Sequence, residues 1–289
     1  MKKQLFKILV FSFILAACED KIEVELDEGT SQLAVDAFIN NKSNTHKIRL
    51  TKTSGYFVNS ASPAALGATV TVTDNKKNKV FNFIDNDKNG NYICTTAAGD
   101  TLGIIGNEYT LSINYDGQNF TATSSMYPAP PIDSIPYIYK EKDMGAGVQK
   151  SGYYASFYAK DFAGMTNFYW IKTIRNDTLN TNPSNINIAW DAAFGPGADG
   201  LTFILPIRES ITQRPFHKND TLSVEIHAIN EETLNYLLEV RTQTTNSGLF
   251  ATPPANVRTN IKNLNSNSKI TVVGFFNIGA ASVAGIRIK

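Results

Sequence analysis

Six consecutive residues have the spacing that opens a calcium-binding loop. They are Asp85-Asn86-Asp87-Lys88-Asn89-Gly90, in which oxygen-bearing side chains at alternate positions can converge on one cation while the glycine makes a sharp turn. Such a loop also needs a bidentate carboxylate at its twelfth position, where this chain has Thr96. A polar hairpin turn before Tyr92 is therefore the favoured interpretation, and calcium binding by Asp85, Asp87 and Asn89 stays open as the alternative. We assign no metal or cofactor to the chain.

Catalysis by a nucleophile lacks its usual sequence signals. No Gly-x-Ser-x-Gly occurs, and the three histidines, His46, His217 and His227, do not have the i,i+4 spacing of metal ligands. His227 alternates with apolar residues of a predicted strand and is expected to face solvent. His46 and His217 lie at predicted strand edges, which are ordinary surface positions. We predict no catalytic residues and no enzymatic activity. Because a triad is an arrangement in space, an unrecognised hydrolase site is kept as the weakest hypothesis.

Aromatic side chains offer another chemistry, the stacking of a ring against a sugar or a peptide. Phe168-Tyr169-Trp170 and Tyr153-Tyr154 lie on predicted strands, where aromatic residues more often belong to a core. Trp190 precedes Asp191 in a predicted loop and is the better candidate for an exposed contact.

Four tripeptides combine aspartate, a hydroxyl residue and an aliphatic residue. They are Asp100-Thr101-Leu102, Asp133-Ser134-Ile135, Asp177-Thr178-Leu179 and Asp220-Thr221-Leu222. Composition predicts about one such match by chance. The pattern resembles the O-glycosylation motif of exported proteins of the Bacteroidota, which implies glycosylation at Thr101, Ser134, Thr178 and Thr221. The alternative is that this order of residues suits a turn that enters a strand.

The N-terminal residues have the regions of an export signal. Lys2, Lys3 and Lys7 form a basic region, and the apolar stretch 8–17 is too short to cross about 30 Å of hydrocarbon as a helix. Leu15-Ala16-Ala17-Cys18 resembles the lipobox of bacterial lipoproteins. The resemblance implies cleavage before Cys18 and attachment of acyl chains, such as palmitate, to its thiol and new amine. We predict a signal peptide over 1–17. An ordinary secretory signal is the alternative.

The residues after Cys18 indicate where the mature protein is sent. Glu19 and Asp20 resemble the acidic patch beside the lipidated cysteine of surface-exported lipoproteins, and residues 18–30 are predicted to be an acidic tether. Loss of the three leader lysines changes the formal net charge from +1 to −2 and leaves no basic block for binding nucleic acid. With Cys18 lipidated, Cys94 has no disulfide partner within the chain and is interpreted as a small buried residue.

From Ser31 onward, alternation of apolar and polar residues predicts strands. The clearest example runs from Tyr109 to Tyr115 and is followed by Asp116-Gly117, which favours a type I′ hairpin turn. We predict a mainly β chain with an immunoglobulin-like or transthyretin-like sandwich. The predicted parts are a β-sandwich over 31–126, a proline-rich linker over 127–136, and a second β-rich domain over 137–289.

The second domain is predicted to carry one helix over about 231–243. Asn230 can cap it, Glu231 and Glu232 suit the positive end of its dipole, and the apolar stripe should pack on one face of the second sheet. The stripe comprises Leu234, Leu237, Leu238 and Val240. The strands expected in this domain are Tyr153–Ala159, Phe168–Ile174, Leu201–Ile207, Leu222–Ile229 and Ile270–Phe276.

Segments along nearly the whole mature chain resemble a lipoprotein family of the Bacteroidota known as domain of unknown function 4249. The resembling segments are Gly55-Tyr56-Phe57, residues 66–72, Gly90-Asn91-Tyr92, residues 108–111, residues 127–135 and residues 251–261. Gly274-Phe275-Phe276 corresponds to the family's habitual Gly-Tyr-Phe. The resemblance implies an outer-membrane lipoprotein that often accompanies TonB-dependent, SusC-like transporters. The family has no established catalytic residues that could be carried over.

We therefore expect a non-catalytic accessory lipoprotein, anchored through Cys18 at the surface side of the outer membrane. Its expected partner is a TonB-dependent transporter or another envelope β-barrel complex. The alternative is a glycan- or peptide-binding lipoprotein that acts on its own and uses Trp190 or the cluster around Tyr153 as a platform.

Overall fold

The computed structural model describes residues 30–55, 58, 60–97, 100–148, 150–190, 197, 199–246, 251, 255–265, 267–268 and 270–289. Residues 31–289 form one compact unit. The predicted signal peptide, Cys18, Glu19, Asp20 and all of the predicted tether except Thr30 lie outside the described residues. Among the residues described, no helix combines the length and the apolar character needed to cross a membrane.

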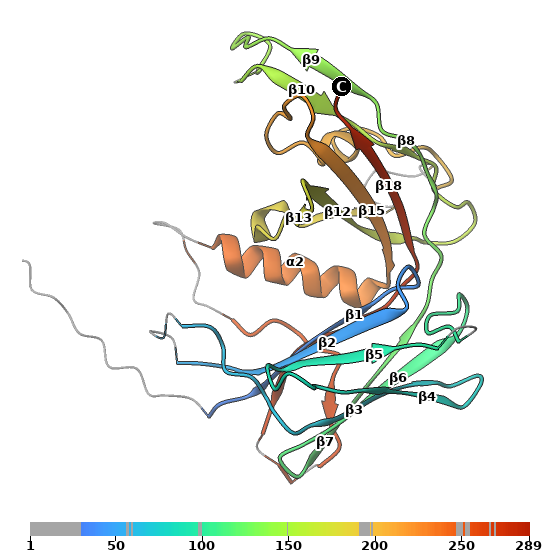
Figure 1. The fold of residues 1–289 in the computed structure, drawn as a ribbon, viewed down its shortest axis with the longest axis vertical. Helices are drawn as coiled ribbons and strands as arrows, with labels where there is room; N and C mark the ends of the chain where they lie inside the picture. Colours follow the sequence, from blue (N-terminus) through green and yellow to red (C-terminus); the bar gives the residue numbers. More distant parts are fainter. Residues whose placement is uncertain are drawn as a thin grey trace, which may run out of the picture. The chain divides into compact units, whose positions relative to one another are not determined.

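Two sheets enclose the first core (Figure 1). One has the order β17-β1-β2-β5, with β1 Leu33–Ile39, β2 Thr45–Lys52, β5 Asn91–Thr95 and β17 Val272–Ile278. The other has the order β16-β7-β6-β3-β4, with β3 Thr69–Asp74, β4 Lys79–Phe83, β6 Glu108–Tyr115, β7 Gln118–Ser125 and β16 Lys262–Asn263. We call these nine strands the N-terminal sandwich. The prediction of a mainly β chain with an N-terminal β-sandwich is confirmed.

Alternation of side chains explains why this part of the sequence forms strands. In β6, buried Tyr109, Leu111 and Ile113 alternate with more exposed residues, as expected for a sheet with one face on a core. Asp116 and Gly117 have φ angles of 50° and 69° between the paired residues Tyr115 and Gln118. This is the predicted type I′ turn.

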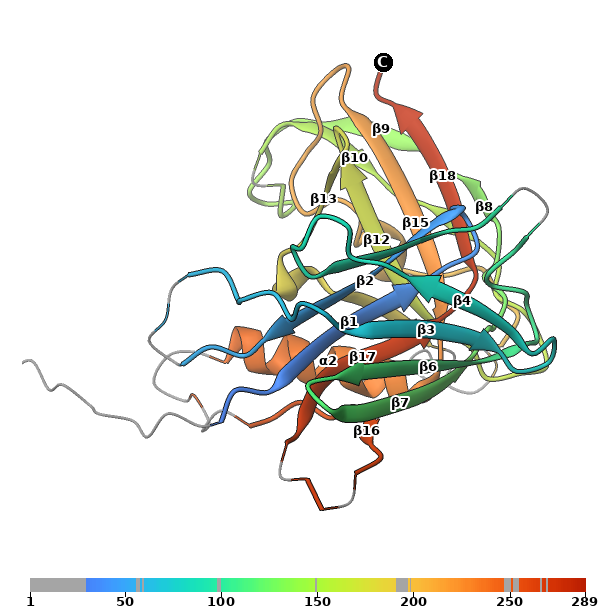
Figure 2. The same ribbon diagram turned by 60° about the horizontal axis from the view of Figure 1, so that its bottom comes forward.

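Two C-terminal segments complete the N-terminal sandwich, which differs from the predicted division at residues 127–136. β17 pairs in parallel with the whole of β1, and β16 pairs with β7 at Thr121 and Phe120. Ile261, Val272, Phe276 and Ile278 belong to the first core. The chain therefore returns to its first sandwich, and residues 137–289 are not a separate contiguous domain. Figure 2 shows β17 beside β1.

The second half is built on one antiparallel sheet, which we call the second sheet. Its order is β13-β12-β15-β18, and β14 pairs with β12 as well. The strands are β12 Phe168–Arg175, β13 Thr178–Leu179, β14 Asn187–Trp190, β15 Thr221–Ile229 and β18 Ala281–Arg287. Two small antiparallel pairs lie nearby, β8 Ile132–Ser134 with β11 Tyr158–Ala159 and β9 Tyr137–Lys140 with β10 Gly152–Ala155. Short 3₁₀ turns cover Pro183–Asn185 (η1) and Ile207–Glu209 (η3).

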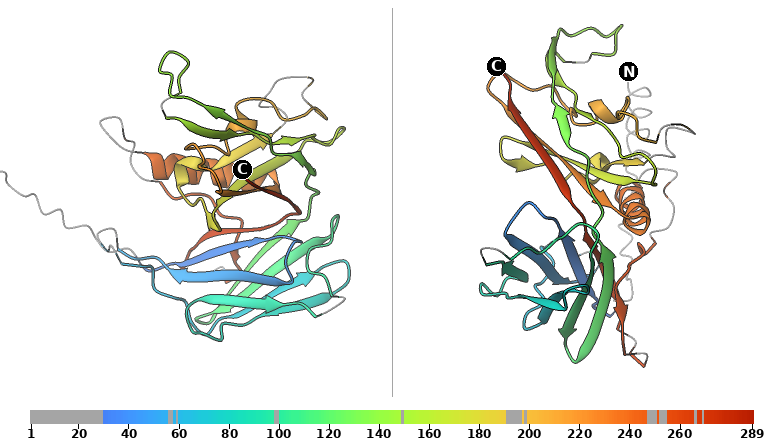
Figure 3. Two further views of the ribbon diagram at one scale, coloured as in Figure 1. Left: turned by 45° about the horizontal axis from the view of Figure 1, so that its top comes forward. Right: turned by 90° about the vertical axis from the view of Figure 1, so that its right-hand side faces the viewer.

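The second sheet is covered on both faces. On one face Tyr169, Ile171 and Val224 pack with Phe157, Phe203 and Phe216. On the other, Trp170 and Ile229 pack with α2, Glu231–Thr245, and with Phe38 of β1. Figure 3 shows α2 lying against the sheet. The predicted helix is confirmed, including its cap, because the Asn230 side chain accepts a hydrogen bond from Thr233 N at 2.8 Å.

One predicted strand, Leu201–Ile207, is wrong. Thr202 forms only an isolated bridge with Lys160, and Pro206 leads into η3. Proline has no N–H to donate to a ladder and fixes φ, so the apolar run that surrounds it does not continue as a strand.

Candidate binding groove

The three histidines lie in different settings, and two differ from prediction. His217 is exposed, as expected. His46 is only 5% exposed on β2, and its Nε2 has no hydrogen-bond partner; burial lowers its pKa. His227 is 8% exposed because α2 and β1 cover the face of the second sheet that was expected to meet solvent.

His227 belongs to a polar cluster beneath that cover. Its Nε2 lies 2.6 Å from Glu225 Oε2. Burial lowers the pKa of His227 although Glu225 opposes the change, and the hydrogen bond lowers the pKa of Glu225. A neutral imidazole that donates to a carboxylate satisfies both directions. Lys172 Nζ lies 3.9 Å from the ring centroid of Trp170, and burial lowers its pKa.

The calcium-like segment is a tight turn that connects β4 to β5, two strands of different sheets that meet only at an isolated antiparallel bridge between Ile84 and Ile93. Asp85 uses its carboxylate to accept hydrogen bonds from Asn89 N at 3.1 Å and Gly90 N at 2.8 Å. Gly90 has φ +81°, and a Cβ there would lie 2.4 Å from Leu50 O. No three His, Cys, Asp or Glu side chains in the described ranges gather as a metal site. The hydrogen bonds of Asp85 and the turn at Gly90 agree with the interpretation as a polar turn.

The predicted glycosylation sites differ in accessibility. Thr101, Ser134 and Thr178 are exposed, whereas Thr221 is half-buried. The aliphatic residue that ends each tripeptide is buried in three of the four, at Leu102, Ile135 and Leu222. The fourth, Leu179, is 42% exposed. Asp220-Thr221 enters β15, as the turn interpretation expects. Glycosylation of these four residues stays a prediction.

The aromatic candidates also separate. Trp190 lies in β14, not in a loop, and packs half-buried against the cluster under α2, so its assignment as an exposed contact is wrong. Tyr153 forms edge-to-face contacts with Tyr137 and Tyr139, with ring centroids 5.7 and 5.2 Å away. Tyr139 is 53% exposed on the hairpin of β9 and β10. Cys94 is buried, and burial raises its pKa, which confirms its interpretation as a small buried residue.

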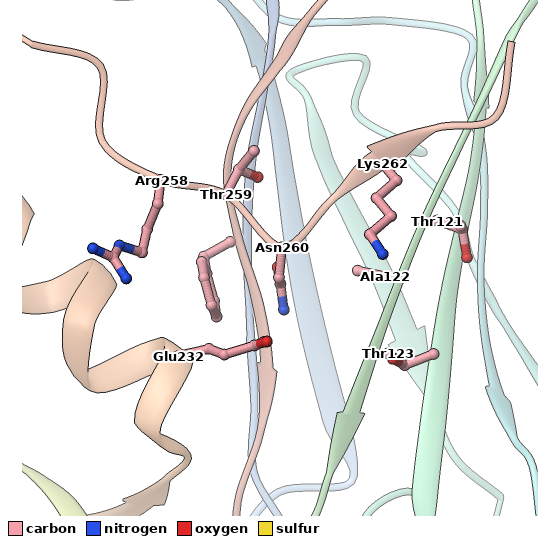
Figure 4. Close-up of a pocket in the computed structure, with 9 residues that line it drawn as sticks. Thr121, Ala122, Thr123, Glu232, Arg258, Thr259, Asn260 and Lys262 are labelled. Atoms are coloured by element: carbon pink, nitrogen blue, oxygen red, sulfur yellow. The ribbon is translucent and has the colours of Figure 1, made fainter. Parts of the chain in front are cut away.

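A polar groove that the sequence did not indicate lies beside β7. It has a volume of about 370 Å³. Its lining residues are Thr121, Ala122, Thr123, Glu232, Arg258, Thr259, Asn260, Lys262 and Phe275. In Figure 4, Glu232 extends from α2 and Lys262 from β16 into this space. Neither side chain makes a hydrogen bond or ion pair with another described residue.

The other polar residues of the groove are engaged. Arg258 pairs with Glu239 at 2.5 Å; their hydrogen bond lowers the pKa of Glu239 and raises that of Arg258. Asn260 Nδ2 donates to Phe276 O at 2.8 Å, and its Oδ1 accepts from Phe276 N at 3.0 Å. Phe275 is 1% exposed and stacks on Tyr236 at 4.7 Å. The groove therefore has a fixed frame and two opposite charges, those of Glu232 and Lys262, whose side chains bond to no other described residue.

A second pocket, of about 270 Å³, shares Glu232 with the groove. It is lined by Tyr127, Pro128, residues 166–169 and residues 228–232. Glu232 thus lies where two depressions meet, at the first turn of α2.

The family model for Domain of unknown function (DUF4249) matches residues 19–284. The chain belongs to this family. Two of the segments that resemble DUF4249 hold neighbouring parts of the fold in place. Asn260, in the segment 251–261, accepts a hydrogen bond from Phe276 N in β17. Tyr92 Oη accepts a hydrogen bond from Ala68 N, in the segment 66–72, at 3.0 Å. In Gly274-Phe275-Phe276, the glycine lets β17 approach β1, since a Cβ would lie 1.9 Å from Val35 O.

No curated protein matches the sequence. A crystal structure of bovine butyrophilin is 10% identical, and the match covers 68% of this chain and 92% of that one with a TM-score of 0.18. A similarity at this score carries no argument about fold or function.

Proposed function

We propose that this chain is a non-catalytic accessory lipoprotein, anchored through Cys18 at the outer membrane, which binds an outer-membrane β-barrel protein. A TonB-dependent, SusC-like transporter is the expected class of partner. The lipobox and the DUF4249 resemblance support the anchor and the partner class.

The observation that carries the binding role is the surface of the β9–β10 hairpin. Ile138 is 58% exposed, Tyr139 53%, and Met144, in the connection between the two strands, 67%. Ile138 and Tyr139 are consecutive in β9 and so lie on opposite faces of the hairpin. An element that exposes large apolar side chains on both faces is a candidate for burial against a partner protein. Figure 1 shows this hairpin beyond the end of the second sheet farthest from the N-terminal sandwich.

Co-purification from solubilised outer membranes tests this proposal. The double variant I138S/Y139S is expected to recover at least about tenfold less β-barrel partner, because apolar anchors dominate such interfaces. V80S is the matched control, since Val80 is 51% exposed on a strand of the N-terminal sandwich. Wild-type protein that comes through mild detergent extraction without a stoichiometric β-barrel protein would contradict the proposal.

The anchor has its own test. C18S is expected to lack the added mass of the acyl chains and to leave the outer-membrane fraction, because the thiol that would receive those chains is absent. If C18S stays with membranes at unchanged mass, the lipid anchor is wrong. A control at Cys94, C94S, should stay membrane-bound.

A second candidate function, direct capture of a glycan or peptide, is favoured by the groove beside β7. Its free carboxylate and ammonium groups lie in one depression large enough for a small polar ligand. Titration of full-length protein in detergent with glycan and peptide panels tests it. Binding that E232Q weakens would support this function, and binding to neither panel would rule it out.

A further inference from the structure

One strand edge inside the groove has unpaired backbone groups. Lys262 pairs with Thr121, and Leu264 N donates to Asn119 O at 2.8 Å. Odd-numbered residues of β7 therefore point their N–H and C=O groups toward β16, and even-numbered residues point theirs toward β6. Thr123 is the next odd residue. No described residue bonds to its N–H or C=O, and Thr123 is exposed in the groove.

The shortness of β16 leaves this edge open. If β16 began two residues earlier in the chain, Asn260 would lie opposite Thr123. Instead, both polar atoms of the Asn260 side chain bond to the backbone of Phe276 in β17. Pairing along β7 therefore ends at Lys262, the first residue of β16. A groove of about 370 Å³ lies where a longer strand would continue.

We propose that an extended peptide segment of a partner protein binds here by adding to β7 as a short strand. This inference rests on the second candidate function and selects peptide over glycan. An extended peptide presents N–H and C=O groups with the period of a strand, so it can satisfy Thr123 and then Ser125, whose outward groups are also unpaired. A sugar has no such repeat.

The charges at the two sides of the groove define the preferred peptide. Glu232 extends from α2 and Lys262 from β16, and neither has a partner among described residues. A peptide with a basic side chain toward α2 and an acidic side chain toward β16 would pair both. Arg258 adds little selection, because Glu239 already neutralises it.

Fluorescence anisotropy with full-length protein in detergent tests the proposal. The probe is a library of labelled, end-capped hexapeptides of alternating threonine and valine, in which one position is lysine and another is glutamate. A second library carries an N-methyl group on every backbone nitrogen, so that neither edge of the extended peptide can donate to a strand. The unmethylated library should contain members that bind with Kd below about 1 mM, and the methylated counterparts should bind at least about tenfold more weakly because they cannot complete the ladder.

Two variants at Thr123 separate backbone from side-chain recognition. T123P removes the outward N–H together with the threonine side chain, at a position where an edge strand tolerates proline, and should weaken peptide binding about tenfold. T123V keeps the N–H and should bind as wild type does. E232K should shift preference to peptides with glutamate in place of lysine, and this provides a readout should T123P fail to fold.

Equal binding by methylated and unmethylated peptides, or no binding member in either library, would overturn the inference. Equal binding by T123P and T123V would also overturn it. Co-purification with a β-barrel protein is measured in parallel on the same variants. A barrel partner retained without peptide binding would remove strand addition while leaving the accessory function intact.

Discussion

The N-terminal sandwich and the second sheet bury polar side chains in different ways. In the sandwich they hold loop backbone: Tyr92 Oη donates to Ala65 O at 2.8 Å, Tyr109 Oη accepts from Ile104 N at 2.7 Å, and Asp74 Oδ1 accepts from Lys76 N at 3.0 Å. In the second sheet, ionisable side chains pair with one another. Arg175 pairs with Asp220, and Glu225 with His227.

This difference shows which parts of the fold should respond to pH. Burial raises the pKa of Tyr92 and Tyr109, so their hydroxyls stay neutral over the ordinary range. The pairs of the second sheet depend on charge and are linked to protonation. Loss of a tyrosine hydroxyl should therefore cost the same at every ordinary pH, whereas loss of a charged pair in the second sheet should not. In the sandwich, Asp74 and His46 have lowered pKa values and are the groups that link it to protonation.

The largest effect is expected at the junction of the two regions. There β17 belongs to the N-terminal sandwich, and the next strand along the chain, β18, belongs to the second sheet. At Gly274, φ is +97° and a Cβ would lie 1.9 Å from Val35 O. G274A should lower the free energy of unfolding by about 3 kcal/mol or more, because β17 must move away from β1. G117A is the control: its φ is +69° with no atom within 4 Å, and it should cost only about 1 kcal/mol. Urea denaturation measures both, and equal costs would contradict the steric argument.

Asp220 provides the next largest effect. Burial alone would raise its pKa, but hydrogen bonds from Asn176, His217 N and Arg175 lower it to about 2. D220N should cost about 2 kcal/mol at pH 7. A carboxyl group with a depressed pKa stabilises the fold above its unfolded value of 3.8 and loses this contribution as pH falls toward 2.

The difference between wild type and D220N should therefore shrink as pH falls from about 4 toward 2. Urea midpoints at pH 7, 4 and 2.5 measure it. A difference that stays constant over this range would show that the carboxylate charge does not stabilise the second sheet.

A smaller loss without pH dependence is expected in the N-terminal sandwich. Y92F removes the hydrogen bond to Ala65 O and leaves Ala68 N without its acceptor. The cost should be about 1.5 kcal/mol and the same at pH 5 and pH 8, since Tyr92 stays neutral. Y115F, at a half-buried tyrosine on β6 packed against the same core, is the control and should cost less. A cost of Y92F that changes between pH 5 and pH 8 would contradict the view that hydrogen bonds of neutral tyrosines stabilise the sandwich independently of pH.

Local sequence signals predicted the elements that depend on neighbouring residues. Asp116-Gly117 indicated its turn, and Asn230 with the leucines after it indicated α2. The same logic failed for His227 and Trp190, because it assumed that one face of the second sheet meets solvent. That face is covered by α2 and β1, so alternation no longer separates buried from exposed residues.

Long-range pairing lay beyond such signals. Nothing in residues 272–278 indicates that they pair with β1, more than 200 residues earlier in the chain. The groove has the same origin, since β7, α2 and the segment 258–262 meet only in the folded chain. The resemblance of residues 251–261 to DUF4249 pointed to this region without indicating a groove.

The smallest effect expected concerns His227 and tests whether its pairing with Glu225 is neutral or ionic. Burial lowers the pKa of His227, so the unfolded chain takes up a proton that the folded chain refuses as pH falls below about 6.5. Wild type should lose stability in this window, and H227Q should lose less, since glutamine can donate to Glu225 without titrating. His46 makes a parallel contribution in the N-terminal sandwich because burial also lowers its pKa, so H46Q should flatten the pH profile too. Urea midpoints between pH 7.5 and 5 compare the two variants. A steeper loss in H227Q than in wild type would mean that His227 is protonated in the fold and that its contact with Glu225 is an ion pair.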